Sequence, residues 1–186
     1  MKALGIVGSP RKGGNTELLM AHTLKAIAEE GIETELLSLA GKDIRYCTAC
    51  MACRGTEKCS IDDDLMPIYT NMKEADAIIF GSPVYFQGAT GLTRAFLERS
   101  GYISLQNGRV FAGKVGGPLV VTRRTAMSLT FAQMLLWFCG QRFVIPGAMG
   151  TAFGRDKGDV LKDEEGMTNA RDFGKGVAFV LKKLRA

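Results

Sequence analysis

The segment KALGIVG at residues 2–8, followed by SPRKGGNT at residues 9–16, decides the fold of this chain of 186 residues. The first part is a short apolar run that ends in glycine, serine and proline, a pattern typical of a buried strand entering a loop. Asn15 or Thr16 is then placed to cap a helix that Gly31 ends. A strand that passes directly into a helix in this way indicates an α/β protein.

The rest of the chain repeats this alternation. Further strands are predicted at residues 33–39, 76–82, 114–122 and 143–146, and helices from about residue 64, over residues 90–101 and 127–141, and near the C-terminus. Residues 150–166 are polar and rich in glycine, which predicts a surface loop. Five apolar strands alternating with helices predict a doubly wound, three-layer α/β sandwich with a five-stranded parallel sheet. In such folds the ligand binds beyond the carboxyl ends of the strands.

Composition excludes several classes of protein. With 46% hydrophobic and 23% charged residues, the chain has the balance of an ordinary globular protein. No apolar run reaches the ~18 residues of a membrane span, and residues 3–7 are too short for a signal peptide, so a cytoplasmic location is expected. The net charge of +5 is spread among acidic residues without a nucleic-acid-binding motif, so no nucleic-acid partner is expected.

The loop after the first strand carries the groups that hold a phosphate. Hydroxyl, amide and guanidinium side chains meet backbone N–H groups there at the start of a helix. The Walker pattern is absent because Gly14-Asn15 stands where Lys-Ser/Thr is required, and G-x-G-x-x-G is absent too. A plain, well-capped strand–helix connection is the alternative. The predicted phosphate-binding residues are Ser9, Arg11, Gly14, Asn15 and Thr16.

The pattern Ser9-x-Arg11-x-x-Gly14-Asn15-Thr16 resembles the flavin-phosphate loop of the NAD(P)H-dependent FMN reductase group, within the flavodoxin-like fold. The stretch GSPVYF at residues 81–86 looks like the second signature of that group. The resemblance implies that Pro83, Val84, Tyr85 and Phe86 contact the isoalloxazine ring of FMN. In the loop after the fourth strand, Thr122 and Arg123 are candidates for contact with the ring. That loop lacks the glycines usual in FMN reductases, so direct oxidation of NAD(P)H is not predicted.

Four of the five cysteines fall within thirteen residues, in the pattern Cys47-x-x-Cys50-x-x-Cys53-x5-Cys59. Two consecutive C-x-x-C steps followed by a fourth cysteine can place thiolates around a compact [4Fe-4S] cluster. Structural zinc and free or reversibly oxidised thiols are the alternatives. Arg45, Arg54 and Lys58 are expected to offset the negative charge of such a cluster, and Asp62 or Asp63 to cap the helix that follows. Cys139 is expected to be an inert buried thiol.

A flavin loop combined with this cysteine motif resembles the iron–sulfur flavoprotein family. The resemblance implies a single flavodoxin-like FMN-binding domain over residues 1–186, with a cysteine-rich loop at about residues 45–63. It implies a flavin-dependent oxidoreductase that passes electrons between FMN and a [4Fe-4S] cluster, with ferredoxin, NAD(P)H or a quinone as the undetermined redox partner, and assembly as a homodimer or homotetramer. A cluster-free NAD(P)H-dependent FMN or quinone reductase is the alternative. No catalytic side chain is predicted, because a flavin itself supplies the electron sink.

Overall fold

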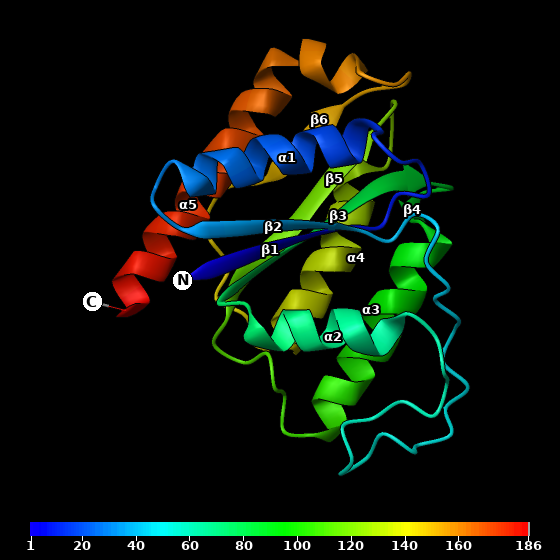
Figure 1. The fold of residues 1–186 in the computed structure, drawn as a ribbon. Coiled ribbons are helices and arrows are strands. Elements are labelled where there is room, and N and C mark those ends of the chain that lie inside the picture. Colours follow the sequence, from blue (N-terminus) through cyan, green and yellow to red (C-terminus); the bar gives the residue numbers. More distant parts are fainter. Residues whose placement is uncertain (186) are drawn as a thin grey trace.

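The structure, a computed structural model, describes residues 1–185 and has a parallel sheet at its centre (Figure 1). The sheet is formed by β1 (Lys2–Val7), β2 (Glu33–Ser38), β3 (Ala77–Tyr85), β5 (Val115–Thr122) and β6 (Gly150–Phe153), in the spatial order β2-β1-β3-β5-β6. The two-residue strand β4 (Gly88–Ala89) turns back antiparallel to the end of β3. The direction of winding reverses between β1 and β3, which confirms the doubly wound α/β fold with five parallel strands.

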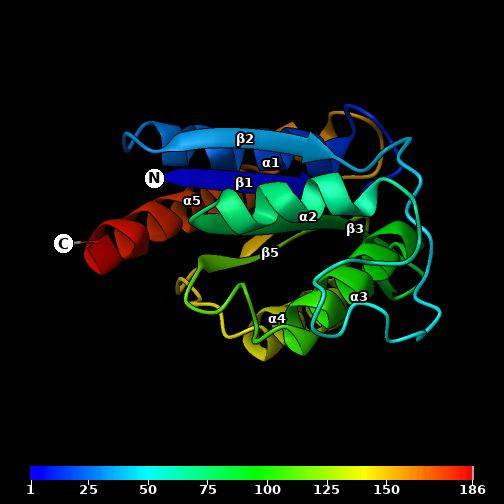
Figure 2. The same cartoon turned by 60° about the horizontal axis from the view of Figure 1, so that its bottom comes forward.

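Helices cover both faces of the sheet, which gives three layers (Figures 1 and 2). Helices α1 (Asn15–Ala28) and α5 (Glu164–Arg185) lie on one face, and α2 (Leu65–Glu74), α3 (Gly91–Gln106) and α4 (Met127–Gly140) lie on the other. Each face has its own apolar core. Leu19, Ile27 and Phe173 belong to the first core, and Phe80, Phe96 and Phe138 belong to the second. Burial on both faces explains why the central strands are apolar throughout.

The predicted position of the fifth strand is wrong. Of residues 143–146, Val144 forms only an isolated bridge to Val115 at the start of β5. Pro146 has no N–H group to donate and Gly147 follows it, so the ladder is interrupted. The chain rejoins the sheet at Gly150, which pairs with Leu119, so part of the predicted 150–166 surface loop is the edge strand β6. A short 3-10 helix, η1 (Asp159–Lys162), leads from there into α5.

Two smaller predictions also need correction. The N-cap of α1 is Gly14 rather than Asn15 or Thr16, and no side chain caps this end of the helix. Cys139 is exposed near the C-terminal end of α4, not buried as predicted.

The loops that matter for function leave the sheet at one edge. The segments after β1, β3, β5 and β6 all follow the carboxyl ends of parallel strands, and they gather at the right of the sheet in Figure 1. The segment after β2, which contains the four clustered cysteines, starts at the same edge and then runs beside α3 (Figures 1 and 2). Within residues 1–185, no helix is long and apolar enough to cross a bilayer.

Candidate flavin and cysteine sites

The loop after β1 is held tightly against β3 and α3. Gly8 donates its N–H group to the Gly81 carbonyl at 2.8 Å, and its own carbonyl accepts from the hydroxyls of Thr90 at 2.6 Å and Thr93 at 3.1 Å. A Cβ atom on Gly8 would lie 1.9 Å from the Thr93 hydroxyl oxygen, so only glycine fits this approach. This packing fixes the loop where it turns into α1.

The start of α1 is available to an anion. The buried Ser9 hydroxyl accepts from the N–H group of Arg11 at 3.2 Å, which folds the loop back on itself. Because no side chain caps the first turn of α1, its N–H groups and the positive end of the helix dipole are left for a ligand. This is the arrangement that binds a phosphate.

A cavity of about 320 Å³ lies in front of this helix start and extends along the end of β3. It is lined by Ser9, Arg11, Gly14, Asn15, Thr16, Pro83, Val84, Tyr85, Val121, Arg123, Gly154, Arg155 and Asp156. The phosphate loop and the ring-binding segment, far apart in sequence, therefore share one cavity. We call it the flavin pocket below.

Two residues predicted for ring binding do not line the flavin pocket. Phe86 and Gln87 have φ angles of 45° and 67°, so they form the left-handed centre of the β3–β4 turn. This turn carries Phe86 outward, where it is fully exposed. The Thr122 side chain is buried, and its hydroxyl donates to the Thr125 carbonyl at 2.7 Å. Both residues line a neighbouring hollow instead.

The sequence reasoning missed the segment after β6, which closes one side of the flavin pocket. Asn15 fastens this segment, because its amide nitrogen donates to the Asp156 carbonyl and its amide oxygen accepts from Gly158 N–H, both at 2.8 Å. A Cβ atom on Gly154 would lie 2.7 Å from the Asn15 amide nitrogen, so glycine is needed there too. In the sequence, only Gly154 and Gly158 indicate a tight approach of this segment to another part of the chain. Because the fifth strand was predicted at residues 143–146, residues 150–166 were assigned to a surface loop.

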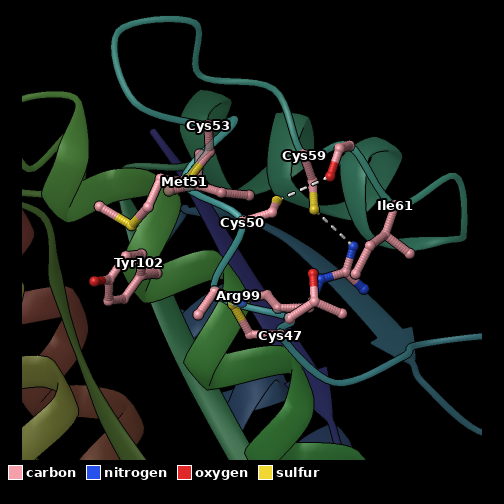
Figure 3. A pocket seen from close by; sticks show the side chains of 12 residues that line it. Cys47, Cys50, Met51, Cys53, Cys59, Ile61, Arg99 and Tyr102 are labelled. Carbon is pink, nitrogen blue, oxygen red and sulfur yellow. Dashed lines mark hydrogen bonds between the residues drawn. The ribbon is translucent and has the colours of Figure 1, made fainter.

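The second candidate site is the pocket in which the cysteine loop, residues 45–63, lies against α3. All four clustered cysteines line it, and Figure 3 shows Cys50 and Cys59 between Cys53 above and Cys47 below. None of the chain's cysteines forms a disulfide. Ala49 and Met51 have φ angles of 53° and 61°, a left-handed backbone that is costly for non-glycine residues.

The thiols in this pocket differ in their surroundings. Cys50 is exposed, and its sulfur lies 3.1 Å from the Ser60 hydroxyl oxygen, a hydrogen bond that lowers the pKa of the thiol (Figure 3). Burial raises the pKa of the Cys53 thiol. Cys59 accepts a hydrogen bond from the guanidinium of Arg99 at 3.1 Å (Figure 3).

Arg99 is a residue of this site that the sequence reasoning did not identify. Its side chain is only 1% exposed, and it forms an ion pair with the fully buried carboxylate of Asp63. Burial alone would raise the pKa of Asp63, but hydrogen bonds from Arg99 and from backbone N–H groups hold it below its usual value. One of these N–H groups belongs to Leu65, the first residue of α2, but the N-cap of this helix is Asp64, not Asp62 or Asp63 as predicted, and no side chain caps it. The predicted cations Arg45, Arg54 and Lys58 are all exposed.

Other side chains attach the loop to α2 and to the end of α3. Asn107 donates to the Cys53 carbonyl at 2.8 Å. Glu57 accepts from the Tyr69 hydroxyl at 3.1 Å and from Lys73 at 2.9 Å. The loop contains no helix or strand of its own, so these contacts and those of Arg99 determine its path.

The donor set of this pocket suits an iron–sulfur cluster better than a single metal ion. Within residues 1–185, no three His, Cys, Asp or Glu side chains are arranged to hold one ion. A [4Fe-4S] cluster binds each thiolate to a different iron, so its ligands surround a larger volume than those of zinc. Four thiols around one pocket, with an N–H donor to one sulfur, match the chemistry of the cluster, although the cavity between them is only about 20 Å³.

Comparison with known proteins defines the class. Residues 1–156 match the model of the NADPH-dependent FMN reductase family, and the chain belongs to this family. It is a flavin-dependent oxidoreductase with an FMN redox function. The fold is shared with a RosB crystal structure containing 8-demethyl-8-formylriboflavin-5′-phosphate, with a TM-score of 0.83 and 18% identity over 100% of this chain and 80% of that chain. An archaeal flavodoxin gives a TM-score of 0.67 at 13% identity, covering 98% of this chain and 99% of that one.

Sequence relatives narrow the class further. The chain is 41% identical to an iron–sulfur flavoprotein of Methanocaldococcus jannaschii, with 100% of both chains covered. It is 31% identical to an iron–sulfur flavoprotein of Methanosarcina thermophila, over 100% of this chain and 97% of the relative. Within the FMN reductases, the chain is therefore a member of the iron–sulfur flavoprotein family.

Proposed function

We propose that this chain, as a single FMN-binding domain, passes electrons between FMN and one [4Fe-4S] cluster held by Cys47, Cys50, Cys53 and Cys59. The observation that carries the proposal is that all four thiols line one pocket on a loop that starts at the same sheet edge as the flavin pocket. When bound, FMN exchanges two electrons and the cluster exchanges one, so two successive transfers balance one complete flavin reduction.

Different groups of the flavin pocket bind the phosphate and the ring of FMN. The phosphate is bound by the Ser9 hydroxyl, the Arg11 guanidinium and the free N–H groups of Asn15 and Thr16, with Gly14, whose N–H group donates to the Arg11 carbonyl, lining the pocket beside them. The amide of Asn15 is engaged with the segment after β6, so its side chain shapes the pocket while its backbone faces the anion.

The ring lies along the end of β3 and the start of the segment after β5. Pro83, Val84 and Tyr85 supply an apolar wall, and Arg123 supplies a positive charge for the edge of the ring that becomes negative on reduction. Phe86 and Thr122 have no part in this proposal because they lie outside the pocket.

The test compares two cysteines that differ in position. In protein purified without oxygen, Cys53→Ala should lose the cluster, from about four iron atoms per chain to about none, and keep its FMN. The matched control is Cys139→Ala on α4, outside the cysteine loop, which should retain both cofactors. Full iron content in the Cys53 variant would refute the assignment of the ligands.

A cluster-free FMN or quinone reductase is the second candidate. It is favoured by the small size of the cavity between the four thiols, about 20 Å³. A redox donor and acceptor are needed in either case, and their identity, like the homodimer or homotetramer, stays a prediction. Steady oxidation of NADPH by iron-free wild-type protein would select this second candidate.

A further inference from the structure

Arg99 is the largest side chain that the described part of the fold buries completely. It projects from the middle of α3 toward the cysteine loop. There it meets the buried carboxylate of Asp63, with which it forms an ion pair. Removing a guanidinium from water is costly, and the cost is offset only where a carboxylate and further acceptors surround it. The acceptors that surround Arg99 therefore identify what the buried charge serves.

The guanidinium of Arg99 binds three different parts of the cysteine loop. One terminal nitrogen donates to the Arg45 carbonyl at 3.0 Å and to Asp63. The other donates to the second oxygen of Asp63 at 3.1 Å and to the Cys59 sulfur, also at 3.1 Å. The same nitrogen thus joins the carboxylate to the sulfur. The remaining nitrogen, Nε, has no hydrogen-bond partner among the described residues.

We infer that Arg99 sets the reduction potential of the cluster by donating a hydrogen bond to the Cys59 sulfur, with Asp63 moderating its charge. This inference rests on the proposed function. Reduction adds one negative charge to a thiolate-bound cluster, and a neighbouring cation with an N–H donor stabilises that added charge. Arg99 therefore raises the potential, while the carboxylate of Asp63 lowers it.

Two substitutions in one ion pair should then have opposite effects. Arg99→Gln removes the cation and leaves the buried Asp63 carboxylate beside the cluster, so the midpoint potential should become more negative. Asp63→Asn preserves the shape of the side chain and leaves the Arg99 charge uncompensated, so the potential should become more positive. A purely structural role would not produce shifts of opposite sign from the two partners.

The experiment is an anaerobic redox titration of the full chain, with the reduced cluster followed by electron paramagnetic resonance. It compares the wild type with Arg99→Gln, Arg99→Lys and Asp63→Asn. The matched control is Arg54→Gln, because Arg54 follows Cys53 directly and carries the same charge but is exposed. Iron, sulfide and FMN per chain are measured for every variant, and the potential of bound FMN is recorded in the same titration.

The expected result is a negative shift for Arg99→Gln, a positive shift for Asp63→Asn, a value for Arg99→Lys between those of the wild type and Arg99→Gln, and a much smaller shift for Arg54→Gln, because water screens the exposed Arg54 charge. If Arg99→Gln does not hold a cluster, the other two variants decide the matter: the midpoint potential should be above that of the wild type in Asp63→Asn and below it in Arg99→Lys. Shifts of equal sign in the two partners, or shifts no larger than that of Arg54→Gln, would overturn the inference alone. A wild type without iron would overturn the proposed function as well.

Discussion

The flavin pocket and the cysteine pocket are built in different ways. The flavin pocket lies where parallel strands end, and most of its lining comes from short loops whose path is set by the strands and helices on either side. The cysteine loop has no regular structure, and it is held from outside by side chains of α2 and α3 and by Asn107 at the end of α3. One site is positioned by the ends of strands and helices of the sheet, and the other by individual side-chain contacts to an irregular loop.

This difference has a consequence for stability. Loops between packed strands and helices share the stability of the sheet, whereas a segment attached by a few side chains can open without the rest. Substitutions of the tethering side chains should therefore act on the cysteine loop, and substitutions at the sheet edge should act on FMN. The predictions below test that separation.

The largest effect is expected from Asp63→Ala. It leaves the Arg99 guanidinium buried without its carboxylate, which should cost about 3–5 kcal/mol of unfolding free energy. Chemical denaturation of the iron-free protein measures this cost. The control is Asp62→Ala, at the exposed neighbouring position, with an expected change within about 0.5 kcal/mol. Equal stability of the two variants would contradict the role given to the ion pair.

Asn15→Ala should weaken FMN binding without affecting the cysteine loop. It removes two hydrogen bonds of 2.8 Å to the segment after β6, at about 1 kcal/mol each, and a longer one of 3.5 Å from the Val160 N–H group in η1. An increase of roughly 10- to 30-fold in the FMN dissociation constant is expected, because about 1.4 kcal/mol corresponds to a factor of ten. Fluorescence titration with FMN measures it, with Lys25→Ala on the exposed face of α1 as the control. Unchanged affinity would mean that the segment does not close on the ligand.

Asn107→Ala tests the separation from the opposite direction. The loss of its hydrogen bond to the Cys53 carbonyl should cost about 1 kcal/mol or slightly more. Hydrogen exchange should become faster in residues 45–63, while the FMN dissociation constant stays within about twofold of the wild type. Faster exchange spread over the whole sheet would show that the loop is not a separate unit.

The smallest effect concerns the two aromatic residues at the β3–β4 turn. Tyr85 lines the flavin pocket and Phe86 does not, so Tyr85→Ala should weaken FMN binding by about 0.5–1.5 kcal/mol. Phe86→Ala should leave the affinity nearly unchanged. The reverse order of the two variants would restore Phe86 as part of the ring-binding wall and would remove the distinction between the two hollows.

Sequence reasoning can place groups in the fold where they are contiguous, and their binding of FMN stays a prediction. The phosphate loop joins a strand to a helix, so its position at the sheet edge followed from the strand pattern, and nine of the eleven predicted flavin residues line the pocket. Phe86 was misplaced because the direction of a side chain in a two-residue turn depends on left-handed backbone angles that the residue types Phe and Gln do not signal.

Other features could not be predicted because they depend on the tertiary structure. Residues 143–146 are apolar, so the last strand was predicted there. Pro146 interrupts the pairing with β5, and the chain pairs again only at β6, which lies in a glycine-rich stretch that predicts a loop. Arg99 lies on a helix, where an arginine is usually exposed, and nothing local shows that residues 36 and 40 positions earlier in the chain surround it.

The measurement that tests the account most directly is the iron, acid-labile sulfide and FMN content of the wild-type protein purified without oxygen. The account predicts about four iron and about four sulfide per chain together with bound FMN. FMN with no iron, or with zinc in place of iron, would contradict the two-cofactor function and leave a plain flavin reductase.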